Sequence, residues 1–277
     1  MTYQFGLIGY PITHSLSPWI HEQFLERTKL QGEYSIIEIS PEKSFSEEME
    51  RLRESNLNGF NITVPYKEKI IDYVDELDEQ AEKIGAVNTV LCKNGRWIGY
   101  NTDGIGYMRA LLQKYPQLTD RKDCQILLIG AGGAAKGIYY ALLTNGYNHI
   151  TIANRSLDKA IQLVGQNSES NVITLDEAEK TLKEFDVIIQ TTSVGMKPDI
   201  EKSVIPITEL KENAIVSDIV YQPLRTKFLH IAQSLGAHIH YGHTMLLYQA
   251  QYAFEIWTNE MPNMDGLDEE LQKILEG

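Results

Sequence analysis

Short, almost purely apolar runs alternate with amphipathic stretches through the second half of this chain. The runs lie at residues 125–130, 149–154, 172–175, 186–191, 214–220 and 237–241. Strands that read as near-continuous apolar runs are typical of a parallel sheet buried on both faces, and the helical periodicity between them indicates covering helices. The pattern therefore predicts a Rossmann-type α/β domain.

The first half predicts another α/β domain, which ends before a polar stretch at residues 116–123. Asn94-Gly95 is a strong turn signal between two of its strands. Strands are expected at 3–9, 33–39, 57–63, 87–92 and 97–101, and helices at 18–30, 42–55, 68–84 and 105–115. Closing helices at 245–258 and 267–275 have no strand after them and could pack on either domain.

Composition and charge disfavour several classes of protein. The formal net charge of −13 over 277 residues disfavours a nucleic-acid partner, whose phosphates would be repelled. No apolar run reaches the roughly 18 residues of a membrane span, and the N-terminus does not resemble a signal peptide. Cys92 and Cys124 lack CxxC spacing and read as reduced thiols. We expect a cytoplasmic protein with a small-molecule substrate and no membrane partner.

A glycine-rich motif stands at the start of the second domain. Residues 126–135 place the pattern G-x-G-x-x-A between a strand and a helix expected at 134–144. Gly130 permits the tight turn, Gly132 lets the backbone approach a pyrophosphate, and Ala135 allows close helix–sheet packing. The anion would lie at the positive end of the helix. An ordinary tight turn is the alternative, but the flanking strands favour dinucleotide binding.

The end of the following strand indicates which dinucleotide is bound. An NAD site has Asp or Glu there for the ribose 2′-hydroxyl, whereas this chain has Asn154-Arg155-Ser156 and no carboxylate before Asp158. The planar cation of Arg155 suits a 2′-phosphate. Arg155 could instead be a solvated side chain, with Ser156 as the N-cap of the next helix. We expect NADP as the cofactor.

Two serines mark a candidate anion site in the first domain. Ser17-Pro18 is a favourable helix start, so Ser17 taken alone is most simply an N-cap. Ser15 lies two residues earlier, and two hydroxyls beside free helix amides could bind a carboxylate.

Lys67 and Asp103 are the candidate reactive groups of this domain. Lys67 follows Pro65 at the expected start of helix 68–84, where the helix macrodipole disfavours a cation. Asp103 follows the strand at 97–101 and could face the same cleft. The alternatives are a solvated lysine and an aspartate that only caps the next helix.

Two other kinds of site are disfavoured. The histidines lack a paired acidic motif such as HExxH, so no metal is expected. The Gly-x-Ser-x-Gly elbow of a serine nucleophile is also absent from the sequence.

Ordered motifs continue along the whole chain. The first domain carries Gly9-Tyr-Pro-Ile-x-His-Ser15-x-Ser17-Pro18, Asn61-x-Thr63-x-Pro65-x-Lys67, Gly85-Ala-Val-Asn88-Thr89 and Asn101-Thr102-Asp103-Gly104. The rest carries Gly130-Ala-Gly-Gly-Ala134, Asn154-Arg155, Thr192-Ser-x-Gly195-Met196, Asp218-x-x-Tyr221-x-Pro223 and Met245-Leu-x-x-Gln249. Together these motifs resemble those of the shikimate dehydrogenase family.

The resemblance implies a reversible, NADPH-dependent reduction of 3-dehydroshikimate to shikimate in aromatic amino-acid (chorismate) biosynthesis. Residues 1–103 would bind the substrate, 104–242 would bind NADP, and 243–277 would form helices packing back on the substrate domain. Lys67 would be the catalytic acid/base, with Asp103 as its partner. The substrate carboxylate would be held by Ser15, Ser17 and Tyr221, and the ring hydroxyls by Thr63, Asn88, Asp103 and Gln249.

The resemblance also implies a set of cofactor-binding residues. They are Gly130, Ala131, Gly132, Gly133, Ala134, Asn154, Arg155, Ser156 and Thr192, with Ile219, Gly242 and Met245 around the nicotinamide. Glu79 is a weaker candidate near the cofactor.

Some positions depart from the family pattern without touching Lys67 or Asp103. Gln190-Thr191 stands where Asn-Ala is common, and Thr226-Lys227 replaces a frequent Thr-Pro. The alternative functions are a quinate/shikimate dehydrogenase that uses NAD and a non-catalytic shikimate-binding regulator. A monomer and a homodimer are both compatible with the sequence.

Overall fold

The computed structural model describes residues 2–165 and 167–277 and divides into two compact units. One comprises Met1–Gly106 with Leu247–Met264, and the other comprises Tyr107–Leu246 with Asp265–Gly277. Helices α4 (Asp103–Lys114) and α9 (Gly242–Thr258) contribute residues to both units. Each unit contains a sheet with helices, so the prediction of two α/β domains is confirmed.

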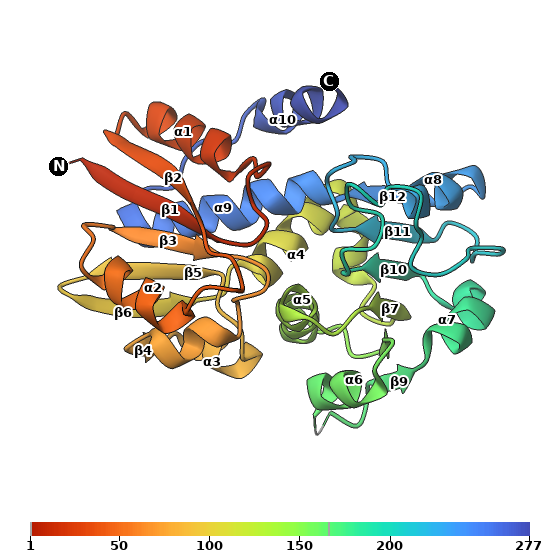
Figure 1. Cartoon of the computed structure of the whole chain (residues 1–277). Helices are drawn as coiled ribbons and strands as arrows, with labels where there is room; N and C mark the ends of the chain where they lie inside the picture. The colour runs from red at the N-terminus through yellow and green to blue at the C-terminus, as the bar shows by residue number, and fades with distance from the viewer. Residues whose placement is uncertain (1, 166) are drawn as a thin grey trace. The chain divides into compact units, whose positions relative to one another are not determined.

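The first unit is built on a mixed sheet with the strand order β2-β1-β3-β5-β6-β4 (Figure 1). Strand β1 pairs in parallel with β2 and β3, whereas β5 is antiparallel to β3 and β6. Asn94 and Gly95 both have positive φ, as a type I′ hairpin turn requires. The strands are β1 (Tyr3–Gly9), β2 (Gly32–Glu38), β3 (Gly59–Ile62), β4 (Glu76–Leu77), β5 (Thr89–Lys93) and β6 (Arg96–Tyr100).

One predicted helix of this unit, at 68–84, is wrong. The structure has a 3-10 helix (Lys69–Tyr73), the short strand β4 and then α3 (Glu79–Ile84). The backbone N–H of Asp75 donates to Trp97 O, which draws this segment onto the sheet edge. Asp78 then caps α3 by accepting from Gln80 N, so the apolar periodicity spans separate elements. Helices α1 (Ser17–Thr28) and α2 (Phe45–Arg53) occur close to their predicted positions.

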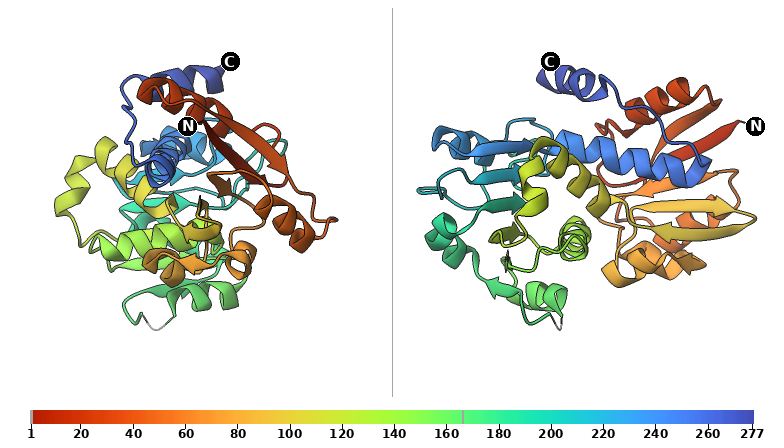
Figure 2. Two further views of the ribbon diagram at one scale, coloured as in Figure 1. Left: turned by 90° about the vertical axis from the view of Figure 1, so that its left-hand side faces the viewer. Right: turned by 180° about the vertical axis from the view of Figure 1, so that it is seen from behind.

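The last turns of α9 belong to the core of the first unit. Gly59 leaves room for the ring of Trp257, which a Cβ at that position would overlap. The indole stacks on Phe5 with ring centroids 4.6 Å apart, and its Nε1 donates to Val90 O at 2.9 Å. This part of α9 therefore packs on the first sheet (Figure 2).

The second unit is built on a parallel sheet with the order β12-β11-β10-β7-β8-β9 (Figure 1). This is the doubly wound order, and the direction of winding reverses between β7 and β10, where such folds bind ligands. The strands are β7 (Ile126–Ile129), β8 (Ile150–Ala153), β9 (Asn171–Ile173), β10 (Val187–Gln190), β11 (Ile215–Asp218) and β12 (His238–Tyr241). The predicted apolar strands are therefore confirmed.

Alternate residues of the second sheet enter two hydrophobic cores. Leu128 of β7 packs in one core with Ile138 of helix α5, and Leu127 packs in the other with Phe228 of helix α8. The helices are α5 (Gly133–Thr144), α6 (Leu157–Val164), α7 (Leu175–Thr181), α8 (Lys227–Ser234) and α10 (Leu267–Glu276). Short 3-10 helices lie at Pro116–Asp120 and Leu182–Glu184.

Two kinds of feature are absent from the part of the chain that the structure describes. No helix in residues 2–165 and 167–277 is long and apolar enough to cross a membrane. Within the same residues, no group of three or more His, Cys, Asp or Glu side chains is placed to hold a metal ion.

Candidate active site

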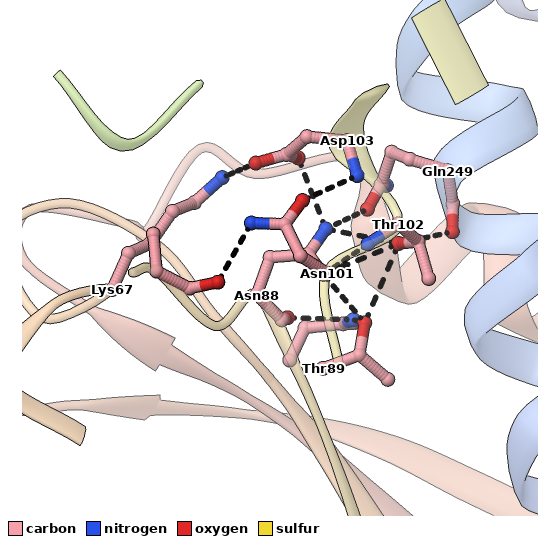
Figure 3. A network of polar contacts seen from close by, with 9 residues as sticks. Lys67, Asn88, Thr89, Asn101, Thr102, Asp103 and Gln249 are labelled. Carbon is pink, nitrogen blue, oxygen red and sulfur yellow. Dashed lines mark hydrogen bonds and ion pairs between the residues drawn. The ribbon is translucent and has the colours of Figure 1, made fainter. Parts of the chain in front are cut away.

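Lys67 and Asp103 form a largely buried ion pair in the first unit (Figure 3). The ammonium group of Lys67 donates to Oδ2 of Asp103, and the two side chains are only 14% and 5% exposed. Removing two charges from water is costly, and each charge here offsets the cost of burying the other. The two groups singled out from the sequence are therefore brought together by the fold.

The helix-dipole argument for Lys67 is wrong, because no long helix begins there. Lys67 lies two residues before a single 3-10 turn, and its carbonyl accepts from Val87 N at 2.8 Å. The backbone is thus fixed to the segment that leads into Asn88. The partner that matters for the ammonium group is the carboxylate of Asp103.

The alternative interpretation, in which Asp103 only caps a helix, is also wrong. Asp103 is the first residue of α4, and both of its carboxylate oxygens accept hydrogen bonds from side chains. Lys67 binds Oδ2, while Asn88 Nδ2 donates to Oδ1 at 3.0 Å. The backbone N–H of Asp103 donates to Asn101 Oδ1 at 3.1 Å. The carboxylate is therefore held in one orientation.

Asn88 is the centre of this network (Figure 3). Its Oδ1 accepts from the backbone N–H of Thr102 at 2.8 Å, which fixes the amide because a backbone N–H can only donate. The amide nitrogen consequently faces Asp103, Thr102 Oγ1 at 2.9 Å and Gln249 Oε1 at 3.3 Å. Gln249 lies on α9, and its backbone carbonyl oxygen accepts a hydrogen bond from Thr102 Oγ1 at 2.9 Å. Three of the predicted substrate-binding residues, Asn88, Asp103 and Gln249, thus share one network.

A second layer of the network was not identified as functional from the sequence. Tyr34 Oη donates to Asn61 Oδ1 at 2.8 Å, and Asn61 Nδ2 donates to Thr89 Oγ1 at 3.1 Å. Thr89 Oγ1 donates in turn to Asn88 Oδ1 at 2.9 Å. The adjacent motifs that contain Asn61 and Thr89 were the available signal, but only the fold shows that they meet.

Ser15 and Ser17 also meet. Their hydroxyls lie 3.2 Å apart, and Ser17 N donates to Ser15 Oγ at 3.2 Å. Interpreting Ser17 as an N-cap is wrong, because α1 begins at Ser17 and Leu16 occupies the N-cap position. Ser17 is nevertheless buried, at 6% exposure.

Thr63 lies where the loops after β1 and β3 run side by side. Tyr10 N donates to Val64 O at 2.9 Å, and a Cβ at Gly9 would overlap the methyl group of Thr63. Gly9 therefore allows the segment that leads to Ser15 to approach the segment that leads to Lys67.

In the second unit, the glycine-rich loop joins β7 to α5 as predicted. Gly130 has a φ of +119°, and a Cβ there would overlap Thr191 Oγ1, so this position requires glycine for internal reasons. Gly132 is the N-cap of α5, and a Cβ there would meet no atom of the described residues within 4 Å. Ala135 is fully buried in the core beneath the helix.

The start of α5 fits a phosphate group. Within the described residues no side chain caps this helix, so its first amides face outward beside Gly132. Ala131 is buried, whereas Gly133 and Ala134 are half-buried at the same turn. A glycine that the protein itself does not require, beside uncapped amides, is consistent with the close approach of a ligand.

Arg155 is exposed just beyond β8, where a 2′-phosphate is expected. Ser156 takes the N-cap position of α6, but among the described groups its hydroxyl makes no capping bond. Asn154 Nδ2 donates to Ser156 O at 2.8 Å and shapes the turn that carries the arginine. A cation, a hydroxyl and a helix start therefore occur together.

The other predicted cofactor residues of this unit lie on or beside the loops after β10 and β11. A Cβ at Gly242 would overlap the carbonyl of Ile219, so the start of α9 packs on that loop. Ile219 and Met245 contact the same core. Thr192 Oγ1 accepts from Val194 N at 3.2 Å, and Tyr221 is half-buried on the second loop.

Glu79 occupies a different kind of environment. It begins α3 in the first unit and pairs with Lys83 at 2.6 Å on an exposed surface. This ion pair lowers the pKa of Glu79. The contact with Lys83 also gives the carboxylate of Glu79 a partner within the protein, so no cofactor is needed to explain the residue.

Comparison with known proteins agrees with this geometry. Three family models match: shikimate dehydrogenase substrate binding domain at residues 7–90, shikimate / quinate 5-dehydrogenase at 112–221, and shikimate 5′-dehydrogenase C-terminal domain at 242–268. The shikimate dehydrogenase (NADP(+)) of Oceanobacillus iheyensis is 52% identical over 277 residues, which is 100% of both chains.

Solved structures extend the comparison to three dimensions. Shikimate 5-dehydrogenase of Thermus thermophilus, in complex with NADP(H) and shikimate, is 31% identical with a TM-score of 0.86, and the match covers 98% of this chain and 99% of that chain. Quinate dehydrogenase of Corynebacterium glutamicum, in complex with NAD, is 27% identical with a TM-score of 0.83 and the same coverage. Sequence identity along the entire chain decides the family. The chain belongs to the shikimate dehydrogenase family.

Proposed function

We propose that this chain catalyses the reversible, NADPH-dependent reduction of 3-dehydroshikimate to shikimate, a step of aromatic amino-acid biosynthesis, with Lys67 as the acid/base. The observation that carries the proposal is the buried pair of Lys67 and Asp103 within a polar network. A paired, largely buried ammonium group is a proton donor whose position is fixed, which is what reduction of a ketone requires.

Bound NADPH supplies the hydride in this reaction. As the hydride adds to the ring carbonyl carbon, negative charge develops on its oxygen, and the ammonium group of Lys67 donates a proton there to give the alcohol. In the reverse direction Lys67 accepts the hydroxyl proton. Asp103 stabilises the positive charge of Lys67 and orients it, and Asn88 holds Asp103 from the other side.

Substrate binding is assigned to two sets of polar side chains. Ser15 and Ser17 present two hydroxyls at the start of α1 for the substrate carboxylate, with Tyr221 as a third donor. The ring hydroxyls are assigned to a second set, Thr63, Asn88, Asp103 and Gln249. Hydroxyl, amide and carboxylate groups of this kind suit a polyhydroxylated ring because each can exchange a hydrogen bond with water for one with the substrate.

NADP is assigned to the second unit. The uncapped start of α5 and the open space at Gly132 suit the pyrophosphate, and Arg155 with Ser156 suits the 2′-phosphate. Thr192, Ile219, Gly242 and Met245 are assigned to the nicotinamide side. Glu79 plays no part in this proposal, since its pairing with Lys83 explains it.

The experiment is a spectrophotometric assay of shikimate oxidation with NADP and with NAD, and of quinate with each. We expect shikimate with NADP to exceed every other combination in kcat/KM by more than about tenfold. The preference for NADP over NAD is expected because a contact between Arg155 and the 2′-phosphate would be charge-assisted. Equal rates with NAD would contradict the role of Arg155.

An NAD-dependent quinate/shikimate dehydrogenase is the second candidate. The relative that favours it is the quinate dehydrogenase in complex with NAD, whose fold this chain shares. The absence of a carboxylate from Asn154-Arg155-Ser156 speaks against it. A non-catalytic regulator that only binds shikimate is excluded if the assay detects turnover.

The finer organisation is part of the same proposal. We assign residues 1–103 to substrate binding and 104–242 to NADP binding. Of the predicted closing helices at 243–277, only Leu247–Met264 complete the first unit, whereas Asp265–Gly277 with α10 belong to the second unit, so the prediction that both helices pack on the substrate domain is wrong for α10. The thiols of Cys92 and Cys124 are free, which fits a cytoplasmic enzyme. A monomer or a homodimer would be distinguished by sedimentation of the purified protein.

A further inference from the structure

Asp218 ends β11 with a fully buried carboxylate that the proposed reaction does not use. Its Oδ2 accepts from Thr226 Oγ1 at 2.7 Å, and its Oδ1 accepts from Val220 N at 2.9 Å and Gln190 Nε2 at 3.2 Å. Thr226 is in turn the N-cap of α8. One carboxylate therefore closes the whole connection between β11 and α8.

Gln190, beside Asp218 in the sheet register, does the same for the preceding loop. Its Nε2 donates to Thr192 O at 3.1 Å and Val194 O at 3.2 Å, and its Oε1 accepts from Thr192 N. The side chain is fully buried. The side chain of Gln190 therefore bonds the backbone of the loop after β10 and also the carboxylate of Asp218.

These two loops carry residues assigned to the cofactor. Thr192 lies on the first loop and Ile219 on the second, and both loops leave the carboxyl ends of strands, where ligands of this fold bind. Thr191 Oγ1 donates to Ile129 O at 2.7 Å, and it is also the atom that a Cβ at Gly130 would overlap. The first loop is therefore packed against the glycine-rich turn.

We infer that Gln190 and Asp218 form a buried clasp that positions the loops after β10 and β11 for NADP, so that Asp218 is a positioning residue of the reaction although it touches no reactant. The inference rests on the proposed function for the identity of the nucleotide. The clasp itself rests on the hydrogen bonds of Gln190, Thr226 and Val220.

The clasp depends on hydrogen bonds rather than on a charge pair. The three groups that bind the carboxylate of Asp218 carry no formal charge, and burial raises the pKa of Asp218 to about 7. An asparagine would keep the bonds from Val220 N and Gln190 through its oxygen. Its amide would donate to Thr226 Oγ1, whose two lone pairs allow it to accept this bond beside the one from Leu229 N.

The test compares Asp218→Ala, Asp218→Asn and Gln190→Met in the full-length protein. NADP affinity is measured by direct titration, and kcat and KM are measured for shikimate oxidation. We expect Asp218→Ala and Gln190→Met to weaken NADP binding by about tenfold or more, because each strands buried polar groups. Asp218→Asn should recover binding to within about threefold of the wild type, since hydrogen bonds of ordinary strength remain.

A folded Asp218→Ala variant with wild-type NADP affinity would overturn the inference. If Asp218→Ala does not fold, the test rests on Gln190→Met, and a wild-type NADP affinity of that variant would overturn the inference. Equal impairment of Asp218→Asn and Asp218→Ala would mean that the charge is required, which also contradicts the clasp. Asp176→Ala, an exposed aspartate on α7 of the same unit, is the matched control.

Amide hydrogen exchange without any nucleotide separates the clasp from the proposed function. Exchange at residues 191–194 and 219–226 should accelerate in Asp218→Ala and not in Asp218→Asn. Unchanged exchange in Asp218→Ala would overturn the clasp. Failure of the proposed function would appear in the wild-type protein itself, as lack of NADP binding or of shikimate oxidation, and would leave the exchange result intact.

Discussion

Two buried aspartates, one in each unit, are treated in opposite ways. Asp103 pairs with the ammonium group of Lys67, whereas Asp218 is bound by a hydroxyl, an amide and a backbone N–H, all neutral. Counted over the whole residue, the exposed fractions of Asp103 and Asp218 are nearly the same, at 3% and 0%. The difference therefore lies in the partners and not in the depth of burial.

The comparison separates the aspartate assigned to the proposed chemistry from the aspartate proposed to hold loops in place. A carboxylate beside a cation keeps its charge and can stabilise a proton donor next to the substrate. A carboxylate among neutral donors is costly to ionise, and burial raises the pKa of Asp218 to about 7. The candidate site of the first unit thus contains an ion pair, while the loops of the second unit are held by hydrogen bonds between neutral groups and a carboxylate.

The largest effect is expected from removing the cation of the first pair. Lys67→Met should lower kcat by about 10²–10⁴-fold, the usual contribution of a positioned acid/base, with a much smaller change in KM for shikimate. Steady-state kinetics of shikimate oxidation measure this split. Lys83→Met, which removes a lysine from an exposed ion pair, is the matched control and should be close to neutral.

The same substitution leaves Asp103 buried without its cation, which should also cost stability. The double variant Lys67→Met with Asp103→Asn should recover thermal stability but not kcat. Recovery of both would mean that Lys67 is structural, and near-normal turnover of the single variant would refute its role in proton transfer.

The second prediction concerns the pH dependence of stability that Asp218 imposes. The pKa of Asp218 is raised from 3.8 to about 7, so the folded protein retains a proton that the unfolded chain releases. The contribution of Asp218 to stability is therefore fully present below about pH 4, falls as pH rises from about 4 and is lost above about pH 7. The difference corresponds to an upper limit of roughly 4 kcal/mol.

The variant Asp218→Asn has no ionisable group at this position, so its stability lacks this pH dependence. Its melting temperature relative to the wild type should increase between about pH 4 and pH 7 and level off above that range. Thermal unfolding across this range measures the difference, with the control Asp176→Asn showing no such trend. A pH-independent difference would place the pKa of Asp218 near its ordinary value.

Arg155→Ala tests the proposed recognition of the 2′-phosphate by the exposed arginine after β8. Loss of a charge-assisted contact to the 2′-phosphate should raise KM for NADP by about 10–100-fold and leave the weaker use of NAD unchanged. Lys180→Ala, which removes another exposed cation of this unit, is the control. A parallel loss with both cofactors would show that Arg155 acts only on the structure.

Much of the fold follows from local patterns, and the sites show where those patterns stop. The parallel strands were predictable because strands buried on both faces must be apolar, and the turn at Asn94-Gly95 because its backbone requires positive φ. The predicted helix at 68–84 failed because a pairing with β6, distant in sequence, overrides local periodicity.

The candidate site divides in the same way. Lys67 and Asp103 could be singled out as charged residues at the ends of elements, but their pairing depends on the packing of distant segments. Asn61, Thr89 and Gln190 are buried polar residues whose partners only the fold reveals. Sequence motifs contained Asn61 and Thr89, and Gln190 stands out only as a departure from the family pattern. Nothing in their spacing specified which donor meets which acceptor.

Gly132→Ala and Gly130→Ala form a matched pair in the glycine-rich turn. The protein leaves open space at Gly132, so alanine there should preserve stability and weaken NADP binding by about tenfold through contact with the phosphate. Alanine at Gly130 meets Thr191 and adopts a positive φ, so it should destabilise the fold by about 1–3 kcal/mol. Equal effects of the two variants on stability would remove the argument that Gly132 serves a ligand.

The smallest effect is expected at Thr89, which lies behind the ion pair of the first unit. Thr89→Val keeps the shape but removes the hydroxyl that joins Asn61 to Asn88. Asn88 retains its bond from Thr102 N, so the amide should stay oriented and the loss should be about 1 kcal/mol of stability with a severalfold fall in kcat/KM. Denaturant unfolding and steady-state kinetics measure the two quantities.

Thr144→Val, at an exposed threonine whose hydroxyl bonds its own helix, controls for the loss of a hydroxyl as such. If Thr89→Val lowers kcat as strongly as Lys67→Met, the buried relay is part of the proton-transfer machinery rather than its support. If it changes neither quantity, the orientation of Asn88 is set by Thr102 alone. The intermediate result is expected because the backbone N–H of Thr102 already fixes the orientation of the Asn88 amide. The hydrogen bond from the hydroxyl of Thr89 only stabilises that orientation further.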